Sequence, residues 1–128
     1  MEESIRALLL ASSGVSSLVG TRVNFGTHPQ GQPLPAIVLN TISDNEGYTL
    51  TGPNGVTQAR IQADCYADTY GSAKLLSRAV RSLLSGYQNG ALQGVFHITS
   101  RDSREGGSNE AERPYRVSMD FMVHFTTT

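Results

Sequence analysis

The sequence predicts an α+β fold: an antiparallel sheet of about four strands with two helices packed on one face, in the order α-β-β-α-β-β. Three stretches predict it. Residues 57–66 alternate apolar and polar side chains, residues 75–84 repeat apolar residues at helical spacing, and residues 115–126 alternate again. A strand that leads directly into an amphipathic helix forms a two-layer unit, and the rest of the chain must pack on it or pair with it.

The composition indicates one soluble domain spanning residues 1–128. A chain of this length buries roughly two thirds of its unfolded surface. Ten basic and eleven acidic residues leave a net charge of −1, so no basic excess points to nucleic acid. Glu2 and Glu3 stand where a signal peptide needs positive charge, and the apolar run 7–11 is too short to span a bilayer. We therefore expect an intracellular protein with no membrane contact.

The first half of the chain contains a helix and a hairpin. Residues 2–12 combine an acidic first turn with apolar residues at helical spacing, residues 15–19 suggest a further short helical turn, and residues 22–25 suggest a short extended segment. The three prolines within 26–35 predict a surface excursion that leads into an apolar strand at 36–42. We expect this strand to pair antiparallel with residues 57–66 across a long polar connection, 43–56, with a turn at Gly52-Pro53-Asn54-Gly55.

The second half begins with the long helix, which we expect to end near Ser85-Gly86. Its predicted apolar stripe consists of Leu75, Leu76, Ala79, Val80, Leu83 and Leu84. A third strand is predicted at 95–100, followed by a charged loop at 101–114. The last strand, 115–126, is the clearest, because its odd-numbered residues are aromatic or aliphatic and its even-numbered residues are largely polar.

A search for catalytic or metal-binding groups finds little. His97 and His124 lie on neighbouring predicted strands, but two histidines without a third ligand at diagnostic spacing do not predict a metal site. Cys65 is the single cysteine, which excludes an intramolecular disulfide, and its inward position predicts a buried structural thiol. Asp64 and Asp120 could face each other across the sheet, although ion-paired or solvated carboxylates are the more ordinary outcome. We predict no cofactor, no metal and no enzyme activity.

Basic residues are the remaining candidates, as an interface or as the lining of a lumen. Lys74, Arg78 and Arg81 share one side of the long helix and could contact a phosphate backbone, but on a neutral domain such a stripe more often forms a solvated or inter-subunit face. The full candidate set is Arg60, Lys74, Arg78, Arg81, Arg101, Arg104 and Arg113. The residues favour a binding or assembly module over an enzyme.

Four segments in fixed order carry a resemblance to a known family: LLLASSGVSSLVGTRV, HPQGQPLPAIVLNTIS, GPNGVTQARIQADCYADTYGSAKLLSRAVRSLL and RPYRVSMDFMVHF. Together they resemble the tail-completion or tail-terminator family of long-tailed phages, which also occurs in prophages and gene-transfer agents. The resemblance covers nearly the whole chain. It rests on the combination of an arginine-valine pair, a proline-rich loop, a proline before the first strand, and a strand that feeds a helix.

The resemblance implies a virion structural protein of the tail, assembled in the cytoplasm of the host bacterium. Such proteins form a ring, usually a homo-hexamer, that caps the tail tube, stops its polymerisation and offers a surface to the neck or head-completion protein. DNA passes through the lumen without sequence-specific binding, and the family has no catalytic residues to carry over. The loops at 26–35, 44–56 and 101–114 are then candidates for contacts, and we expect 101–114 to become ordered on assembly. A head-completion protein and a small enzyme or ligand-binding domain are the alternatives.

Overall fold

The computed structural model describes residues 2–26, 34–49, 52–89, 92–104 and 115–126. Within these residues, three helices and five strands follow one another: α1 (Glu2–Ala11), α2 (Ser13–Val19), β1 (Val23–Phe25), β2 (Ala36–Thr49), β3 (Gly52–Ala67), α3 (Tyr70–Leu84), β4 (Leu92–Arg104) and β5 (Tyr115–Thr126). The predicted helix at 2–12 and the predicted strand at 115–126 are confirmed almost to the residue.

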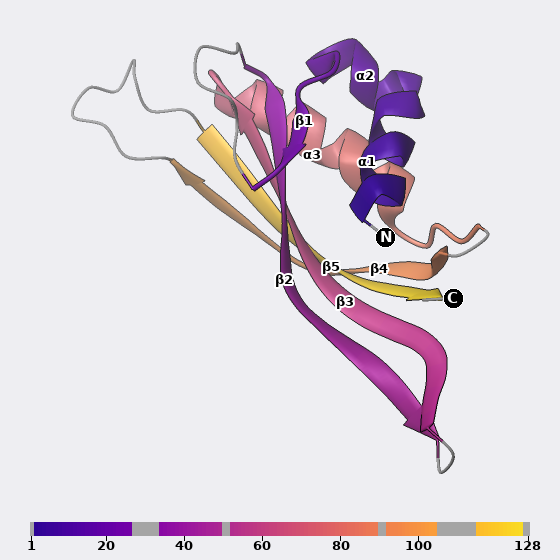
Figure 1. Cartoon of the computed structure of the whole chain (residues 1–128). Coiled ribbons are helices and arrows are strands. Elements are labelled where there is room, and N and C mark those ends of the chain that lie inside the picture. The colour runs from indigo at the N-terminus through magenta and orange to yellow at the C-terminus, as the bar shows by residue number, and fades with distance from the viewer. Residues whose placement is uncertain (1, 27–33, 50–51, 90–91, 105–114, 127–128) are drawn as a thin grey trace.

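The strands form one sheet in the order β1-β2-β3-β5-β4, and the three helices lie on the same side of it (Figure 1). Strands β2, β3, β5 and β4 pair antiparallel, whereas β1 pairs parallel with β2. The α+β class is confirmed. The prediction of four antiparallel strands and two helices is confirmed only in part: the four strands are present, but β1 adds a fifth, parallel strand and α2 a third helix. Both additions fall on the segments 22–25 and 15–19, which are too short to give a clear periodic pattern.

The hairpin of β2 and β3 is longer than predicted. Residues 43–49 and 52–56, expected as a polar connection, continue the two strands, and Thr49 pairs with Gly52. The predicted turn at Gly52–Gly55 is therefore wrong, since these residues begin β3. Cross-strand pairing overrides the turn propensity of glycine and proline here. The pairing of β2 with β3 continues past two register shifts, at 41–43 and 46–48. The far half of the hairpin projects beyond the helices (Figure 1).

Strand β4 also exceeds its predicted bounds. It runs from Leu92 to Arg104, so the first four residues of the predicted loop 101–114 are strand, paired with the start of β5. Because three of these four residues are charged, the sequence predicted a loop and not this pairing. The remainder of that predicted loop and most of the proline-rich excursion lie outside the described residues, and the expectation that 101–114 becomes ordered on assembly stays a prediction.

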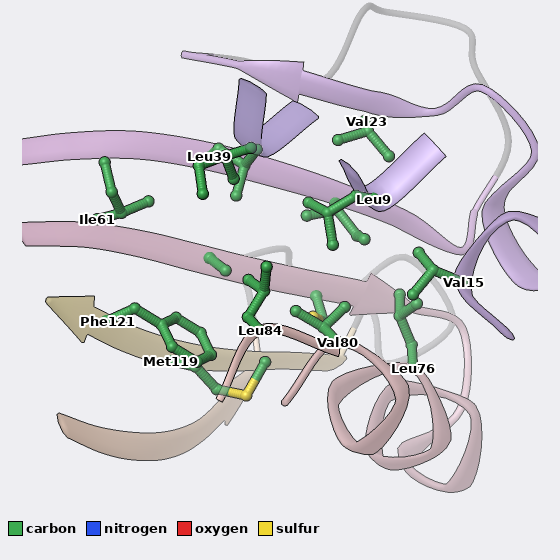
Figure 2. Close-up of a cluster of buried hydrophobic side chains, with 14 of the residues drawn as sticks. Leu9, Val15, Val23, Leu39, Ile61, Leu76, Val80, Leu84, Met119 and Phe121 are labelled. Carbon is green, nitrogen blue, oxygen red and sulfur yellow. The ribbon is translucent and has the colours of Figure 1, made fainter. Parts of the chain in front are cut away.

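The hydrophobic core fills the layer between the helices and one face of the sheet. Leu76, Val80 and Leu84 of α3 point toward side chains of β3 and β5 in this layer (Figure 2). The alternation predicted for β3 is confirmed, because Ile61 and Cys65 belong to this core. Leu75 does not: its side chain is 55% exposed. The buried stripe of α3 is centred on residues 73, 76, 80 and 84, which leaves position 75 at its margin.

Two arginines of the N-terminal part of the chain donate hydrogen bonds to backbone carbonyls at the β1–β2 side of the sheet. Arg6 Nε donates to the carbonyl of Val23 at 2.7 Å, which holds α1 against β1. Arg22 Nε donates to the carbonyl of Pro35 at 2.8 Å, just before β2 begins. Both arginines are half-buried, and their guanidinium groups bind backbone carbonyls within the subunit. The arginine-valine pair that contributes to the family resemblance thus has a structural function.

Candidate assembly surfaces

The basic residues singled out from the sequence fall on two opposite sides of the molecule. Lys74, Arg78 and Arg81 line a groove beside α3, whereas Arg60 and Arg101 meet on the sheet face that carries no helix. Arg104 is the last residue of β4, with only its backbone described. Arg113 lies outside the described residues. The structure therefore divides the predicted set into two separate surfaces.

On the helix side, Lys74 forms a small polar cluster with β4. Its Nζ lies 3.1 Å from Asp102 Oδ1 and 5.6 Å from the centre of the Tyr70 ring, and the Tyr70 hydroxyl donates to Asp102 Oδ2 at 2.8 Å. The Tyr70 and Lys74 hydrogen bonds lower the pKa of Asp102, and the bond to Asp102 raises the pKa of Lys74. The cluster is solvent-exposed, so it orients α3 on β4 more than it stabilises the fold.

A shallow groove of about 120 Å³ continues along the same side of α3. Its lining residues are Lys74, Ser77, Arg78, Arg81, Ser100, Val117 and Met119. Arg78 and Arg81 are exposed and form no ion pair within the part of the chain that the structure describes. These two guanidinium groups are consequently available to an anionic partner.

His97 lies next to this groove. Its Nε2 is 2.7 Å from Ser100 Oγ, and its ring packs edge-on against Phe121 with the ring centres 5.5 Å apart. Burial, and then the positive charge of Arg81, lower the pKa of His97 from its ordinary value of 6.5. His124 follows Phe121 by three residues in β5, so its side chain lies on the other face of the sheet. There its ring packs edge-on against Phe96 of β4. The two histidines are not neighbours in one site.

The opposite face of the sheet is built around Asp120 of β5. Arg60 donates to Asp120 Oδ2 through Nε at 3.1 Å and through Nη2 at 2.7 Å, and Arg101 Nη2 donates to Oδ1 at 3.3 Å. The Asp120 side chain is 6% exposed, whereas those of Arg60 and Arg101 are 38% and 51% exposed. A buried carboxylate thus holds two arginines from the strands on either side of it, so two of the predicted interface positions, Arg60 and Arg101, share one ion-pair partner within the subunit.

Asp64 is the second buried carboxylate on this face. Its Oδ1 accepts a hydrogen bond from Ser118 Oγ at 2.6 Å and another from Gln62 Nε2 at 2.9 Å. Asp64 pairs across the sheet with Ser118, and Asp120 pairs with Gln62. The two carboxylates are therefore diagonal neighbours, each with its own donors. The ion pairs of Asp120 agree with the outcome that the sequence favoured over a catalytic carboxylate pair, whereas Asp64 is not solvated but buried and hydrogen-bonded to neutral side chains.

The remaining chemical candidates have structural explanations. Cys65 is fully buried, and burial, followed by the neighbouring Asp64 charge, raises the pKa of its thiol, as expected for an inert cysteine. Within the described residues, no group of three His, Cys, Asp or Glu side chains could hold a metal ion, and none of the helices is long and apolar enough to cross a membrane. A larger hollow of about 410 Å³ lies beside α1, and Tyr87 is the only titratable side chain in its lining.

Sequence reasoning missed three features of these surfaces. It predicted that the even-numbered side chains of β5 form a largely polar face, but it did not indicate that Ser118 and Asp120 on that face are buried. It placed Asp102 in a loop, where no pairing with Tyr70 or Lys74 could be foreseen. It also did not identify the exposed apolar side chains Ile42, Phe96 and Ile98. The alternation within 95–100 could have indicated the last two, since apolar residues there occupy both faces.

These surfaces are those of an assembly protein and not of a chain organised around a catalytic centre. Its buried carboxylates serve ion pairs and hydrogen bonds. Strand edges that no other described strand covers, and arginines without an ion pair among the described residues, are features of a protein that joins other proteins. Residues 3–126 match the family described as "Tail completion protein gp17". The chain belongs to this family, and it is a structural protein of the phage tail.

A solved structure supports the fold. The chain resembles one from a structure entitled "Virion of native gene transfer agent (GTA) particle", with a TM-score of 0.65 and 22% sequence identity. The similarity covers 96% of this chain and 92% of that one. Among curated protein sequences, none matches. The resemblance to the tail-completion family inferred from the sequence is confirmed.

Proposed function

We propose that this protein is the tail terminator: a homo-hexameric ring that caps the tail tube, stops its polymerisation and joins the tail to the neck. The observation that carries the proposal is the family match across residues 3–126, since completion of a tail requires a protein that ends the tube. A ring subunit also needs two different surfaces that bind each other head to tail. The two open edges of the sheet provide such surfaces.

The projecting half of the β2–β3 hairpin is the proposed contact to the tail tube protein or the neck protein. It extends beyond the helices (Figure 1), so it can reach a neighbouring ring without disturbing the core of its own subunit. Among the described residues, strand β5 pairs with β3 as far as Val56, so the tip of the hairpin is two strands wide there. A narrow two-stranded arm is marginally stable alone and gains stability by packing on a partner.

We assign Arg78 and Arg81 to an acidic surface or to the DNA that traverses the ring. Both are exposed at the groove, whereas Arg60 is held by Asp120. The near-neutral net charge of the chain suits a lumen through which DNA must slide without being retained. Reversing both charges, in Arg78→Glu with Arg81→Glu, should leave the subunit folded and reduce the yield of DNA-filled particles. The matched control is Arg78→Lys with Arg81→Lys, which keeps both positive charges and should not affect DNA content.

Deletion of the gene from its parent phage tests the proposal. We expect tails of abnormal length, or tails that fail to join heads, in negatively stained lysates. The purified protein should form rings at high concentration in light scattering and electron microscopy, or at the ends of tail tubes. Tails of normal length on complete particles after deletion would overturn the proposal. Tails of normal length that accumulate apart from heads would identify a head-completion protein instead.

A further inference from the structure

The sheet has an open edge on each side, and each is open over only part of its length. On one side, β1 covers β2 at Ile37–Leu39, and no described strand lies beside β2 from Asn40 onward. On the other side, β4 is the last strand. Gly86 N donates to the Val95 carbonyl at 2.7 Å and Val95 N to the Tyr87 carbonyl at 3.0 Å, so the start of β4 is covered. Within the described chain, β4 is open from Phe96 onward.

The register of the sheet places these two open stretches at the same level. Reading across β2, β3, β5 and β4, one row contains Thr41, Ile61, Phe121 and His97, and the next contains Ser43, Arg60, Met122 and Phe96. Residues 40–43 of β2 and 96–99 of β4 therefore stand opposite each other across the width of the sheet. Toward one end of the sheet β1 covers β2, and toward the other end residues 86–89 cover β4.

Large exposed apolar side chains are found at this shared level. Ile42 is 53% exposed on the β2 edge, and Phe96 and Ile98 are 54% and 42% exposed on the β4 edge. Ile42 and Ile98 both occupy register shifts, between Thr41 and Ser43 and between His97 and Thr99. Soluble proteins usually protect open edges with charged residues. Here the unprotected part of each edge at this level has no charged residue and carries large exposed apolar side chains, Ile42 on β2 and Phe96 and Ile98 on β4, which indicates that it is covered in the assembled state.

The directions and charges of the two edges are also complementary. Because β2, β3, β5 and β4 are successively antiparallel, β4 runs opposite to β2, and a neighbouring copy related by rotation would place its β2 antiparallel to β4. In sequence, residues 40–49 contain two acidic residues and no basic one, whereas residues 96–104 contain two arginines and one aspartate. Opposite net charges favour β4 against β2 over either edge against itself.

We propose that copies of this chain join edge to edge, with residues 96–99 of β4 beside residues 40–43 of β2 in the next copy, and with Phe96 and Ile98 packed on Ile42. The inference rests on the proposed ring, for which it specifies the subunit interface. Each copy uses its two edges on two different neighbours, and ring closure leaves neither edge open. The overlap is short, so a single contact is weak and the closed ring supplies the stability.

Disulfide trapping tests the contact directly. The double variant Ile42→Cys with Ile98→Cys should, on mild oxidation, shift from a monomer band to a ladder of cross-linked species in a non-reducing gel. Each single variant should stay monomeric, and a mixture of the two single variants should stop at the dimer. The native Cys65 can stay in place because it is fully buried. Ile42→Cys with Leu75→Cys is the matched control, since Leu75 is equally exposed but lies on α3; it should give no ladder.

A charge exchange provides the second test. Ile42→Glu and Ile98→Lys should each abolish assembly, and the double variant should restore it, with unchanged circular dichroism because both positions are exposed. If the wild-type protein forms rings while the double cysteine variant stays monomeric, or if a single cysteine variant cross-links to itself, the edge contact is overturned and the terminator proposal stands. A wild-type protein that remains monomeric at every concentration, together with normal tails after gene deletion, would overturn both.

Discussion

The ion pairs around Asp120 predict that Arg60 contributes more to the stability of the fold than Arg101. Arg60 approaches the carboxylate with two nitrogens, at 2.7 and 3.1 Å, whereas Arg101 contributes one at 3.3 Å and is the more exposed of the two. Truncation of Arg60 leaves a carboxylate that is 94% buried with a single long hydrogen bond. We therefore expect Arg60→Ala to be clearly more destabilising than Arg101→Ala.

The magnitude follows from the burial of the two partners. An exposed ion pair contributes about 0.2–1 kcal/mol, and loss of one partner from a fully buried pair costs about 3–5 kcal/mol. With Asp120 buried and Arg60 partly exposed, Arg60→Ala should lower the free energy of unfolding by about 2 kcal/mol, between these limits. Arg101→Ala should lower it by less than about 1 kcal/mol. Asp120→Ala removes the buried charge as well, so the double variant with Arg60→Ala should be less destabilised than the sum of the two single variants.

Urea denaturation, monitored by circular dichroism at a concentration where the protein is monomeric, measures these differences. The double-mutant cycle of Arg60 and Asp120 should give a coupling of about 1–2 kcal/mol that survives in 0.5 M salt, because a buried charge is weakly screened. Asp120→Asn is the shape-conserving control. A coupling below about 0.3 kcal/mol, or an Arg101→Ala variant as unstable as Arg60→Ala, would refute the reasoning.

Four further predictions concern local features. Thr69→Ala should destabilise the protein by about 1 kcal/mol and Thr69→Ser by much less, because Thr69 Oγ1 accepts the Ser72 N–H at the start of α3; urea denaturation checks this. The lowered pKa of His97 means that the folded state binds its proton less readily, so stability should fall as the pH drops below 6.5, and His97→Gln should flatten that slope between pH 7.5 and 5.5. Because the pKa of Asp102 is lowered in the folded state, its carboxylate stabilises the fold at pH values above its ordinary pKa of 3.8, and this stability is lost as the pH falls through the folded-state pKa. Asp102→Asn should remove that part of the acid-induced loss of stability, which acid titration measures. Gly94→Ala should lower the free energy of unfolding by about 1 kcal/mol, because the new Cβ would lie 2.9 Å from Cζ of Phe96 and displace that ring from His124. Equal stability of Gly94→Ala and wild type, or persistence of the loss in a Phe96→Ala background, would contradict this.

Local periodicity determined the major elements. The alternation of residues 115–126 and the helical spacing after Asp68 reflect which face of each segment is buried, and this information is present in the order of side chains alone. The same patterns placed Ile61 and Cys65 in the core and Arg60 on the other face. The family resemblance, which rests on segments spread over nearly the whole chain, was likewise available without coordinates.

Pairing between distant segments was decided by the tertiary structure. The parallel addition of β1, the extension of β2 and β3 through glycine and proline, and the strand character of residues 101–104 all depend on hydrogen bonds to a partner strand that no local pattern specifies. The burial of Asp120 depends on arginines contributed by two other strands. The register of four strands together places Ile42 on one edge at the same level as Ile98 on the other. A sequence determines which face of a strand is apolar, but only the assembled sheet determines which edges remain open.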